Sequence, residues 1–341
     1  MEVLAIVGPT GTGKSDLVLN VAESIGQIGY LTGRDCEVIN ADAFSLYRGM
    51  DIGTAKVLPA ERRGIPHHLI DIYDPMDVAS IADYQELGRA ALAEVIGRGN
   101  LPIVVGGSGL YVRALLDGFD LPGTDPAVRN ALSAQLDELG IAEMFRRLSE
   151  IDPAAAATIG NRNARRIIRA LEVIQLTGKP FMATLPDPVY RYDTVAIGLD
   201  FNRSLLDARI SQRVGKMRDL GLLAEVAGLA NPDQGGTGAG LGPTAVRAVG
   251  YYELLPVLRG EVDVADGFAA VEVHTRQLTR KQMGWFGRDH RIKWFNGGAG
   301  DLTAQALEYL RNPQPAPQPR RASEPGANQG LRTPLGSTLS T

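Results

Sequence analysis

The residues with the clearest chemical potential form a glycine-rich loop near the N-terminus. An apolar run at 3–7 and a helical pattern from Leu17 onward flank the sequence Gly8-Pro9-Thr10-Gly11-Thr12-Gly13-Lys14-Ser15. This pattern is typical of a phosphate-binding loop, because glycines let the backbone wrap with its N–H groups pointing inward and the next helix adds its positive end. Lys14 supplies a cation for phosphate oxygens, and the Ser15 hydroxyl can bind Mg²⁺. We therefore expect a di- or triphosphate to bind here.

Asp42, which follows the next strand pattern, is the first candidate for acid–base chemistry. Beside a phosphate loop its carboxylate could hold Mg²⁺, as in a P-loop ATPase, or act as a general base toward the attacking group. A third possibility is a helix cap for 43–50. The strand pattern at 101–105 ends in Gly-Gly-Ser, so the candidates for an ATPase acid are limited to Asp42 and the segment with Asp71 and Asp74. This favours the base.

Ser108 and Arg213 complete the candidate catalytic set. Ser108 follows two glycines, so its hydroxyl can approach a ligand closely, although an ordinary loop serine is the alternative. In parallel sheets the ligand lies at the carboxyl ends of the strands, so the phosphate loop, Asp42 and Ser108 should share one cleft. Arg213 stands on a cationic helix stripe with Arg209 and Lys216 and could reach a diphosphate in that cleft.

Alternating strand and helix patterns must position these residues. The predicted strands are 3–7, 36–40, 69–72, 101–105, 194–199 and 291–295. A helix after the Ser80 cap should end at Gly97 or Gly99, and others are predicted at 110–118, 245–259 and 268–286, with a glycine-rich loop at 235–240. The alternation indicates an α/β fold, a P-loop NTPase-like parallel sheet with helices on both faces.

The middle of the chain carries helical patterns alone. The expected helices are 126–139, 141–148, 153–159 and 162–177. Asp-Pro pairs begin two of them, and Gly178 with Pro180 ends the last. We interpret 123–187 as an all-helical insert in a core built from 1–122 and 188–312. The tail at 313–341 is rich in Pro, Gly, Ser and Thr and is predicted to be disordered.

Composition narrows the class of protein. No apolar run approaches the roughly 20 residues that span a bilayer, and the N-terminus enters a strand directly, so we expect no membrane segment, no signal peptide and a cytoplasmic protein. Cys36 is the one cysteine among 341 residues, which excludes an internal disulfide and a cysteine zinc site. The net charge of -4 argues mildly against nucleic acid.

Two local clusters of basic residues argue the other way. Arg162, Arg165, Arg166 and Arg169 have the spacing of one helix face with no acid among them, which is typical of a surface that follows phosphates. The second cluster, with one acid, Asp289, and interleaved amide and aromatic groups, comprises Arg276, Gln277, Arg280, Lys281, Gln282, Trp285, Phe286, Arg288, Arg291 and Lys293. Each cluster could also be a solvated helix face. Together with the phosphate loop they favour a nucleic-acid partner.

Seven segments in order resemble the bacterial tRNA dimethylallyltransferase family. Beside the loop at 8–15, they are Asp42-Ala43-Phe44-Ser45-Leu46-Tyr47-Arg48-Gly49-Met50-Asp51-Ile52-Gly53-Thr54-Ala55-Lys56, Pro66-His67-His68-Leu69-Ile70-Asp71, Gly106-Gly107-Ser108-Gly109-Leu110-Tyr111, Arg169-Ala170-Leu171-Glu172-Val173, Arg247-Ala248-Val249-Gly250-Tyr251 and Arg280-Lys281-Gln282-Met283-Gly284-Trp285. The resemblance covers about 1–295. Ser108 stands where the family usually has Thr, and Tyr252 and Gly287 stand where basic residues are common.

The resemblance implies a prenyl transfer. A dimethylallyl group would pass from dimethylallyl diphosphate to N6 of adenosine 37 in tRNAs that read codons beginning with U, giving N6-isopentenyladenosine. Lys14, Ser15, Arg213 and Mg²⁺ would neutralise the departing diphosphate, with Ser15 as the metal ligand, and Asp42 would accept the N6 proton. The protein would bind the anticodon stem-loop, and we expect it to act as a monomer.

The resemblance also implies which residues face the tRNA. They are Asp42, Ala43, Phe44, Ser45, Ser108, Arg129, Arg165, Arg166, Arg169, Arg247, Gly250, Tyr251, Arg280, Lys281, Gln282 and Trp285. Two alternatives remain at this point. One is a P-loop kinase or an isopentenyltransferase acting on free adenine nucleotides, which needs neither the insert nor the basic clusters. The other is a P-loop ATPase that binds RNA without modifying it.

Overall fold

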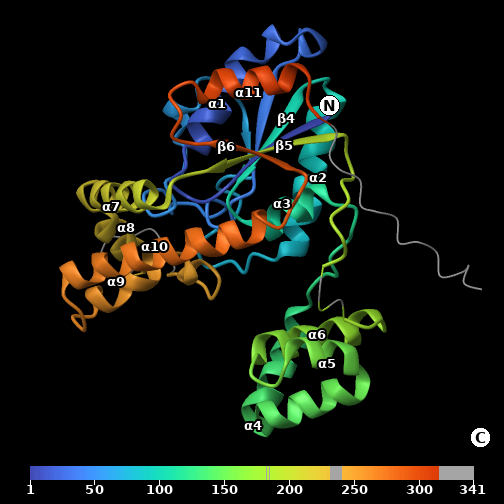
Figure 1. Cartoon of the computed structure of the whole chain (residues 1–341). Helices are drawn as coiled ribbons and strands as arrows, with labels where there is room; N and C mark the ends of the chain where they lie inside the picture. Colours follow the sequence, from blue (N-terminus) through green and yellow to red (C-terminus); the bar gives the residue numbers. More distant parts are fainter. Residues whose placement is uncertain (182, 184, 231–239, 315–341) are drawn as a thin grey trace, which may run out of the picture.

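A single sheet of six parallel strands organises the protein. The computed structural model describes residues 1–181, 183, 185–230 and 240–314 (Figure 1). The strand order is β3-β2-β4-β1-β5-β6, and every neighbouring pair is parallel. The strands are β1 (Val3–Val7), β2 (Cys36–Asn40), β3 (His67–His68), β4 (Leu101–Gly106), β5 (Thr194–Asp200) and β6 (Ile292–Asn296). The predicted α/β class with a parallel sheet is confirmed.

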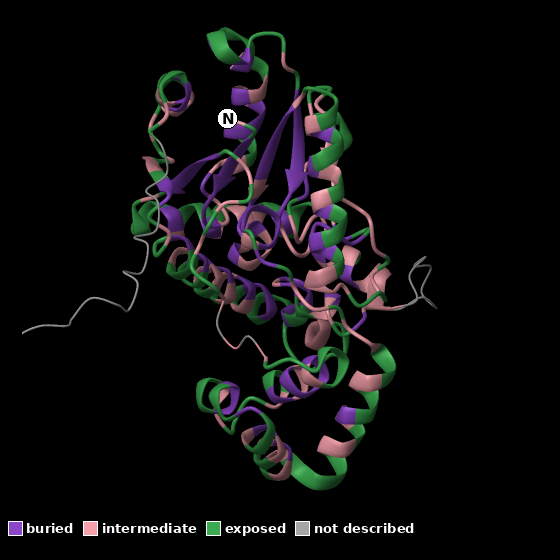
Figure 2. Ribbon diagram, turned by 90° about the vertical axis from the view of Figure 1, so that its right-hand side faces the viewer, coloured by how far each residue is buried: buried purple, intermediate pink, exposed green. Residues whose placement is uncertain are grey.

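Helices cover both faces of this sheet. The core helices are α1 (Lys14–Ser24), α2 (Ile81–Gly97), α3 (Gly109–Leu116), α7 (Arg203–Asp219), α8 (Leu222–Ala230), α9 (Tyr251–Leu258), α10 (Val264–Phe286) and α11 (Leu302–Arg311). Leu4 and Ile6 of β1 pack toward α1 and α11, whereas Val3 and Ala5 pack toward α2 and α3. The central strands therefore read as continuous apolar runs rather than alternating ones, and Figure 2 shows them largely buried.

A third apolar cluster lies beyond the carboxyl ends of the strands. It joins α7, α8, α9 and α10 to the segment after β2, through Tyr47 and Met50. Tyr47, Met50 and Tyr251 are fully buried there. This packing holds the carboxyl ends of the strands, where the predicted site residues lie, against the last long helix.

Several boundaries differ from those expected. The strand predicted at 69–72 is wrong: β3 is the pair His67–His68, and Leu69 and Asp71 have positive φ angles of 60° and 59°, which no strand accommodates. The helix predicted at 245–259 is broken, because Gly250 has a φ of 100° between a short 3₁₀ turn and α9. Neither α8 nor α11 was predicted. The predicted loop at 235–240, except Gly240, and the tail from 315 lie outside the described residues.

The segment 126–177 forms three helices with an apolar core of their own. They are α4 (Pro126–Ile151), α5 (Pro153–Ile159) and α6 (Ala164–Thr177), and Figure 1 shows them as a body below the sheet that two chain segments join to the rest. Leu148 and Ile167 lie in this core. Gly140, with φ 76° and ψ 164°, kinks α4 at the boundary between the two helices predicted there. Arg162 precedes α6, whose cap is Asn163, so Arg162 is not on the expected helix face.

A buried carboxylate fixes the entry to these helices. The Glu172 side chain is fully enclosed and accepts hydrogen bonds from the Thr124 hydroxyl, the Asp125 N–H and the guanidinium groups of Arg129 and Arg169. Arg169 also donates to the carbonyls of Pro122 and Gly123. One charge cluster therefore binds the start of α4, the middle of α6 and the incoming chain segment together.

No helix in the described ranges is long and apolar enough to cross a bilayer.

We predict that Glu172→Ala lowers the free energy of unfolding of the α4–α6 unit by about 2 kcal/mol, because hydrogen bonds to a charged group are lost and Arg129 and Arg169 are left without their anion. Hydrogen exchange of α4 and α6 amides in the whole protein measures the effect. The control is Glu150→Ala, which removes an exposed ion pair with Arg146 and should cost less than about 0.5 kcal/mol. Equal effects would contradict this role for Glu172.

Candidate functional site

The phosphate loop has the backbone that its glycines predict. Gly8, Gly11 and Gly13 have φ angles of 141°, 83° and 88°, values that favour glycine. A Cβ at Gly8 would lie 2.6 Å from the Leu199 carbonyl oxygen, so the loop is pressed against β5. The Thr12 hydroxyl and the Lys14 ammonium both donate to the Pro9 carbonyl, at 2.9 and 2.6 Å. The loop thus closes on itself at the start of α1.

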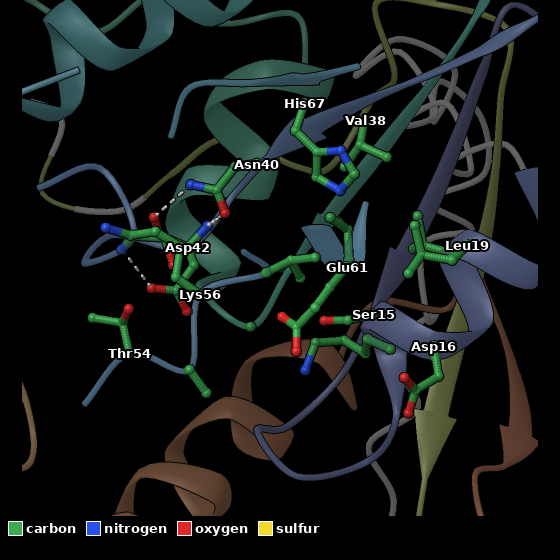
Figure 3. A pocket seen from close by; sticks show the side chains of 18 of the residues that line it. Ser15, Asp16, Leu19, Val38, Asn40, Asp42, Thr54, Lys56, Glu61 and His67 are labelled. Carbon is green, nitrogen blue, oxygen red and sulfur yellow. Dashed lines mark hydrogen bonds between the residues drawn. The ribbon is translucent and has the colours of Figure 1, made fainter. Parts of the chain in front are cut away.

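A pocket of about 610 Å³ opens beside this loop. Figure 3 shows Asp42 and Asn40 on one side of it and Ser15 on the other. Of the residues predicted from sequence, the pocket brings together Thr10, Gly11, Gly13, Lys14, Ser15, Asp42, Ser45 and Arg213. Ser108 is not part of the lining; it follows the lining residue Gly107 and immediately precedes α3. Sequence reasoning assigned no role in this pocket to several further lining residues, among them Lys56, Glu61, His67 and Arg209.

Asp42 is held in a defined orientation by the turn after β2. Its N–H donates to Asn40 Oδ1 and its carbonyl accepts from Asn40 Nδ2, both at 3.1 Å. Asp42 Oδ1 accepts the N–H groups of Phe44 and Ser45, at 2.9 and 3.4 Å. The helix considered at 43–50 is absent, so the cap interpretation is wrong, although the same side-chain contact closes a turn. Asp42 Oδ2 makes no hydrogen bond within the described residues, which leaves it available to a ligand.

The charges of the pocket are mutually coupled. Burial lowers the pKa of Lys14 to about 8; Asp42 raises this pKa and Arg213 lowers it further. Burial also lowers the pKa of Arg213, and Asp42 again opposes the shift. Two poorly hydrated cations therefore lie near one carboxylate. Since the desolvation of a cation favours its neutral form, an anion bound between Lys14 and Arg213 would relieve the cost of keeping both charged.

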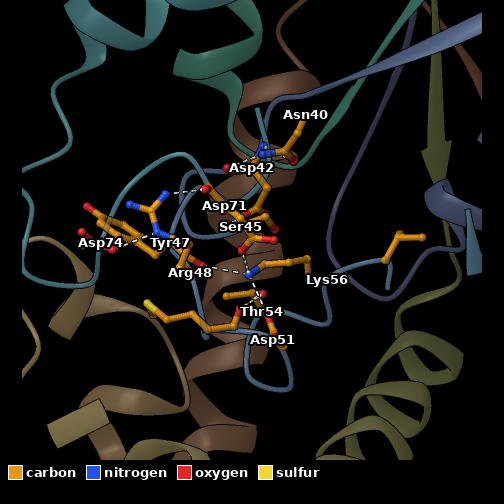
Figure 4. Close-up of polar contacts among 12 residues, drawn as sticks. Asn40, Asp42, Ser45, Tyr47, Arg48, Asp51, Thr54, Lys56, Asp71 and Asp74 are labelled. Carbon is orange, nitrogen blue, oxygen red and sulfur yellow. Dashed lines mark hydrogen bonds and ion pairs between the residues drawn. The ribbon is translucent and has the colours of Figure 1, made fainter. Parts of the chain in front are cut away.

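The irregular segment after Asp42 is secured by the ion pairs of one buried lysine. Figure 4 shows the Lys56 ammonium between Asp51 and Asp71, at 2.5 Å from each carboxylate, and it also donates to the Tyr47 carbonyl. The Lys56 side chain is 2% exposed. On the far side, the Glu225 carboxylate of α8 accepts the N–H groups of 51, 52 and 53, at 3.0, 2.7 and 3.1 Å. No local pattern around Glu225 indicates this contact.

The basic residues of the 126–177 unit fall into two groups. Arg129 and Arg169 are bound to Glu172, an acid that lies among the arginines once α6 forms. Arg166 is exposed and donates to the Ala183 carbonyl. Arg165 is exposed and has no ion pair within the described part of the chain, and its pKa is lowered by partial desolvation and by the nearby cations of Arg247 and Arg129. Arg165 and Arg247 thus form a cationic site between the unit and the core.

The second basic cluster is also smaller than expected. Arg291 is buried and paired with Asp117 and Asp289, and its guanidinium lies 3.7 Å from the centroid of the Tyr190 ring. Arg276 is bound to Glu272, four residues earlier on α10. These two arginines therefore serve the fold. The exposed cations that remain are Arg280, Lys281, Arg288 and Lys293.

The other predicted contacts at this end of α10 differ in exposure. Trp285 is half-exposed and packs over Gly109. Gln282 is 7% exposed, and its Oε1 accepts the Thr10 N–H at 2.9 Å, so α10 contacts the phosphate loop directly. Gly250 and Tyr251 are buried, and the Tyr251 hydroxyl donates to Glu225. The Tyr251 ring is therefore not at the surface that a macromolecule could contact.

A family model and the most similar relatives all indicate the same family for most of the chain. Residues 45–289 match the family model described as IPP transferase. The chain is 48% identical over 309 residues to the tRNA dimethylallyltransferase of Salinispora arenicola, covering 91% of this chain and 86% of that one. It is similarly 48% identical over 310 residues to the protein of the same name from Thermobifida fusca, covering 90% and 94%.

Solved structures agree with this result. The full-length tRNA isopentenylpyrophosphate transferase from Bacillus halodurans is 36% identical, covers 91% of this chain and 94% of its own, and has a TM-score of 0.63. A eukaryotic dimethylallyltransferase acting on tRNA shares the fold with a TM-score of 0.72 at 24% identity, over 90% of this chain and 77% of that one.

We predict that the affinity for inorganic pyrophosphate with Mg²⁺ falls as the pH rises above about 8, by up to tenfold per pH unit. Lys14 loses its proton in this range in the free protein, whereas a bound anion holds the proton on. Calorimetric titrations between pH 7.5 and 9.5 measure the slope. A Lys14→Arg control, which stays charged, should bind with little dependence on pH over this interval. The same slope in both proteins would mean that another group titrates.

Proposed function

Because the chain belongs to the IPP transferase family, we propose that it transfers a dimethylallyl group from dimethylallyl diphosphate to N6 of adenosine 37 in tRNAs that read codons beginning with U. The product is N6-isopentenyladenosine. The observation that carries this proposal is the meeting of Lys14, Arg213 and Asp42 in one pocket. That pocket offers cations for a diphosphate and a carboxylate for an amine proton.

The phosphate loop serves the leaving group in this reaction. The N6 nitrogen forms a bond to the allylic carbon as the bond from that carbon to the diphosphate oxygen breaks, and the diphosphate leaves with the electron pair. Negative charge therefore grows on the bridging oxygen. Lys14, the Ser15 hydroxyl and Arg213 line this pocket and can stabilise it. Because burial already lowers the pKa of Lys14 and of Arg213, these two cations need little rearrangement at the moment of reaction.

Magnesium is part of the same proposal. Within the described ranges no three His, Cys, Asp or Glu side chains lie close enough to enclose a metal ion. Mg²⁺ is usually held by substrate phosphates, waters and one or two protein oxygens, so the residues present fit an ion bound chiefly by the diphosphate. The Ser15 hydroxyl is the expected protein ligand. When bound, the ion would neutralise charge on the diphosphate.

Asp42 is proposed as the base. An exocyclic aryl amine is a weak nucleophile, and the nitrogen must lose a proton as it becomes bonded to carbon. Asp42 Oδ1 is occupied by two backbone N–H groups, which fixes the carboxylate, and Oδ2 is the oxygen free to accept the proton. Fixed orientation matters because alignment of amine and allylic carbon supplies much of the rate.

The tRNA would lie between the core and the α4–α6 unit. Arg165 of the unit and Arg247 of the core are exposed and close enough for Arg247 to lower the pKa of Arg165, and Arg280 and Lys281 are exposed cations on α10. Adenosine 37 must leave its stack to reach Asp42, as other modified bases do. A small nucleotide acceptor would use neither Arg165 nor the α4–α6 unit. Since tRNA is the acceptor, we also propose that the protein works in the cytoplasm.

We predict that Asp42→Asn lowers kcat by about a hundredfold or more and leaves the affinity for tRNA within about threefold of wild type. The amide keeps an oxygen for the Phe44 and Ser45 N–H groups, so the turn survives while the base is lost. The assay follows radiolabel from dimethylallyl diphosphate into unmodified tRNA with Mg²⁺, and digestion identifies N6-isopentenyladenosine. The control is Asp219→Asn, at the exposed end of α7.

Three outcomes of this assay bear on the function. Label in tRNA with wild type and with the control, but not with Asp42→Asn, supports the reaction and the base. Label only in free AMP would point to an enzyme acting on nucleotides. No label in either acceptor, from protein that melts cooperatively, would overturn the proposed function.

We predict that Arg165→Gln weakens tRNA binding about tenfold at low salt and reduces the slope of log K against log salt by about one, because one phosphate contact is lost. Fluorescence anisotropy with a labelled anticodon stem-loop, repeated at several salt concentrations, measures both. Arg218→Gln, at the exposed end of α7, is the matched control and should change neither value. An unchanged slope for Arg165→Gln would exclude it from the phosphate contacts.

A further inference from the structure

The Gln282 side chain lies at the candidate site, where it could do more than pack against its neighbours. It stands on the buried side of α10, while its sequence neighbours Arg280 and Lys281 are exposed. Its side chain reaches the phosphate loop at Thr10 and lies against the second glycine loop, since a Cβ at Gly107 would sit 2.4 Å from Gln282 Nε2. The amide therefore lies between the two loops that form the floor of the site.

The hydrogen bond to Thr10 fixes which way this amide points. A backbone N–H can only donate, so the oxygen of Gln282 must face Thr10 and the –NH₂ group must face away. Gln282 Nε2 makes no hydrogen bond within the described residues, and it is not among the fully enclosed polar atoms that lack partners. The side chain thus presents an oriented, reachable donor toward the site.

The same hollow contains Asp42. A cavity of about 60 Å³ is lined by Thr10, Asp42, Arg213 and Gln282 on its polar side and by apolar groups such as Phe44 and Val249. Because Thr10, Asp42 and Arg213 also line the larger pocket, the two spaces adjoin. One acceptor, the Asp42 carboxylate, and one donor, the Gln282 amide, therefore converge on a space with apolar walls.

We propose that Gln282 is a specificity-determining residue that donates a hydrogen bond to a ring nitrogen of the target adenine while Asp42 accepts from N6. Adenine carries its N6 donor between two acceptors, the ring nitrogens N1 and N7, so an acceptor and a donor side by side match its edge. Guanine presents an oxygen at the corresponding position, which the Asp42 carboxylate would repel. This inference rests on the proposed function and names how the same site selects its base.

The substitution Gln282→Glu removes the –NH₂ donor of Gln282 and changes the size of the side chain little. One carboxylate oxygen can still accept the Thr10 N–H, whereas the other replaces the donor with an acceptor that repels a ring nitrogen lone pair. Gln282→Met, of similar volume, removes the donor without adding charge and serves as the second variant. Synthetic anticodon stem-loops with adenosine, 1-deazaadenosine or 7-deazaadenosine at position 37 remove the ring acceptors one at a time.

We expect wild type to lose about tenfold or more in kcat/KM on one of the two deaza stem-loops, and both variants to lose less than about twofold on that stem-loop relative to their own rate on adenosine. The ratio is taken within each variant, so it does not depend on how much of the protein is folded. Stem-loop affinities, measured by anisotropy, give the same comparison without turnover.

The results separate failure of the inference from failure of the function. Wild type that prenylates the adenosine stem-loop but shows no penalty on either deaza stem-loop overturns the role of Gln282. An equal penalty in wild type and in both variants overturns it as well, and leaves Gln282 as a support for the phosphate loop. Wild type that does not prenylate the adenosine stem-loop overturns the proposed function and this inference together.

Discussion

The desolvation of Lys14 and Arg213 is the constraint on which the rest of the site depends. Two cations that share one carboxylate and little water are costly to keep charged, as their lowered pKa values show. The protein can hold them there because the loop around Lys14 is packed against β5 and Arg213 projects from a helix fixed by its own apolar stripe. An anion bound between the two cations would remove this cost, and the diphosphate of the proposed substrate is such an anion. In the proposed reaction these cations would bind the leaving group, and Asp42, which they share, would act on the acceptor.

Asp42 lies at the start of a segment without regular secondary structure. The polar backbone groups of such a segment need hydrogen-bond partners outside a helix or a sheet. The backbone after β2 passes through a turn closed by Asp42 itself and then runs over the surface of α8 and α10. Lys56 bridges the carboxylates of Asp51 and Asp71, and Glu225 accepts three backbone N–H groups of this segment. Since unpaired buried groups would cost several kcal/mol each, these contacts are what makes a long loop rigid enough to orient the Asp42 carboxylate.

Local patterns predicted the strands and the phosphate loop because both depend on short-range rules. The apolar runs at β1, β4 and β5 and the glycines of 8–13 gave the right elements. The rule that ligands lie at strand ends brought the phosphate loop and Asp42 into one pocket, but Ser108, also expected there, does not line it. The predictions that failed concern features that depend on contacts between residues far apart in sequence. Leu69 and Asp71 adopt positive φ angles in a turn whose Asp71 pairs with Lys56, and such a tertiary contact cannot be read from the local pattern. Nothing near Glu225 or Gln282 in sequence indicates the backbone groups that they bind.

The basic clusters show the same limit of local patterns, because sequence spacing does not reveal which cations are paired. Sequence spacing put Arg165 and Arg169 on one helix face, yet Glu172 binds Arg169 and leaves Arg165 beside another cation, Arg247. Only a cation without an internal partner releases counterions when it meets a phosphate, so paired arginines add little to the affinity for RNA. A protein with a net charge of -4 can thus bind a polyanion through a few unpaired cations. The paired arginines, such as Arg129 and Arg169, instead fix the α4–α6 unit, and so they determine where its unpaired cations lie.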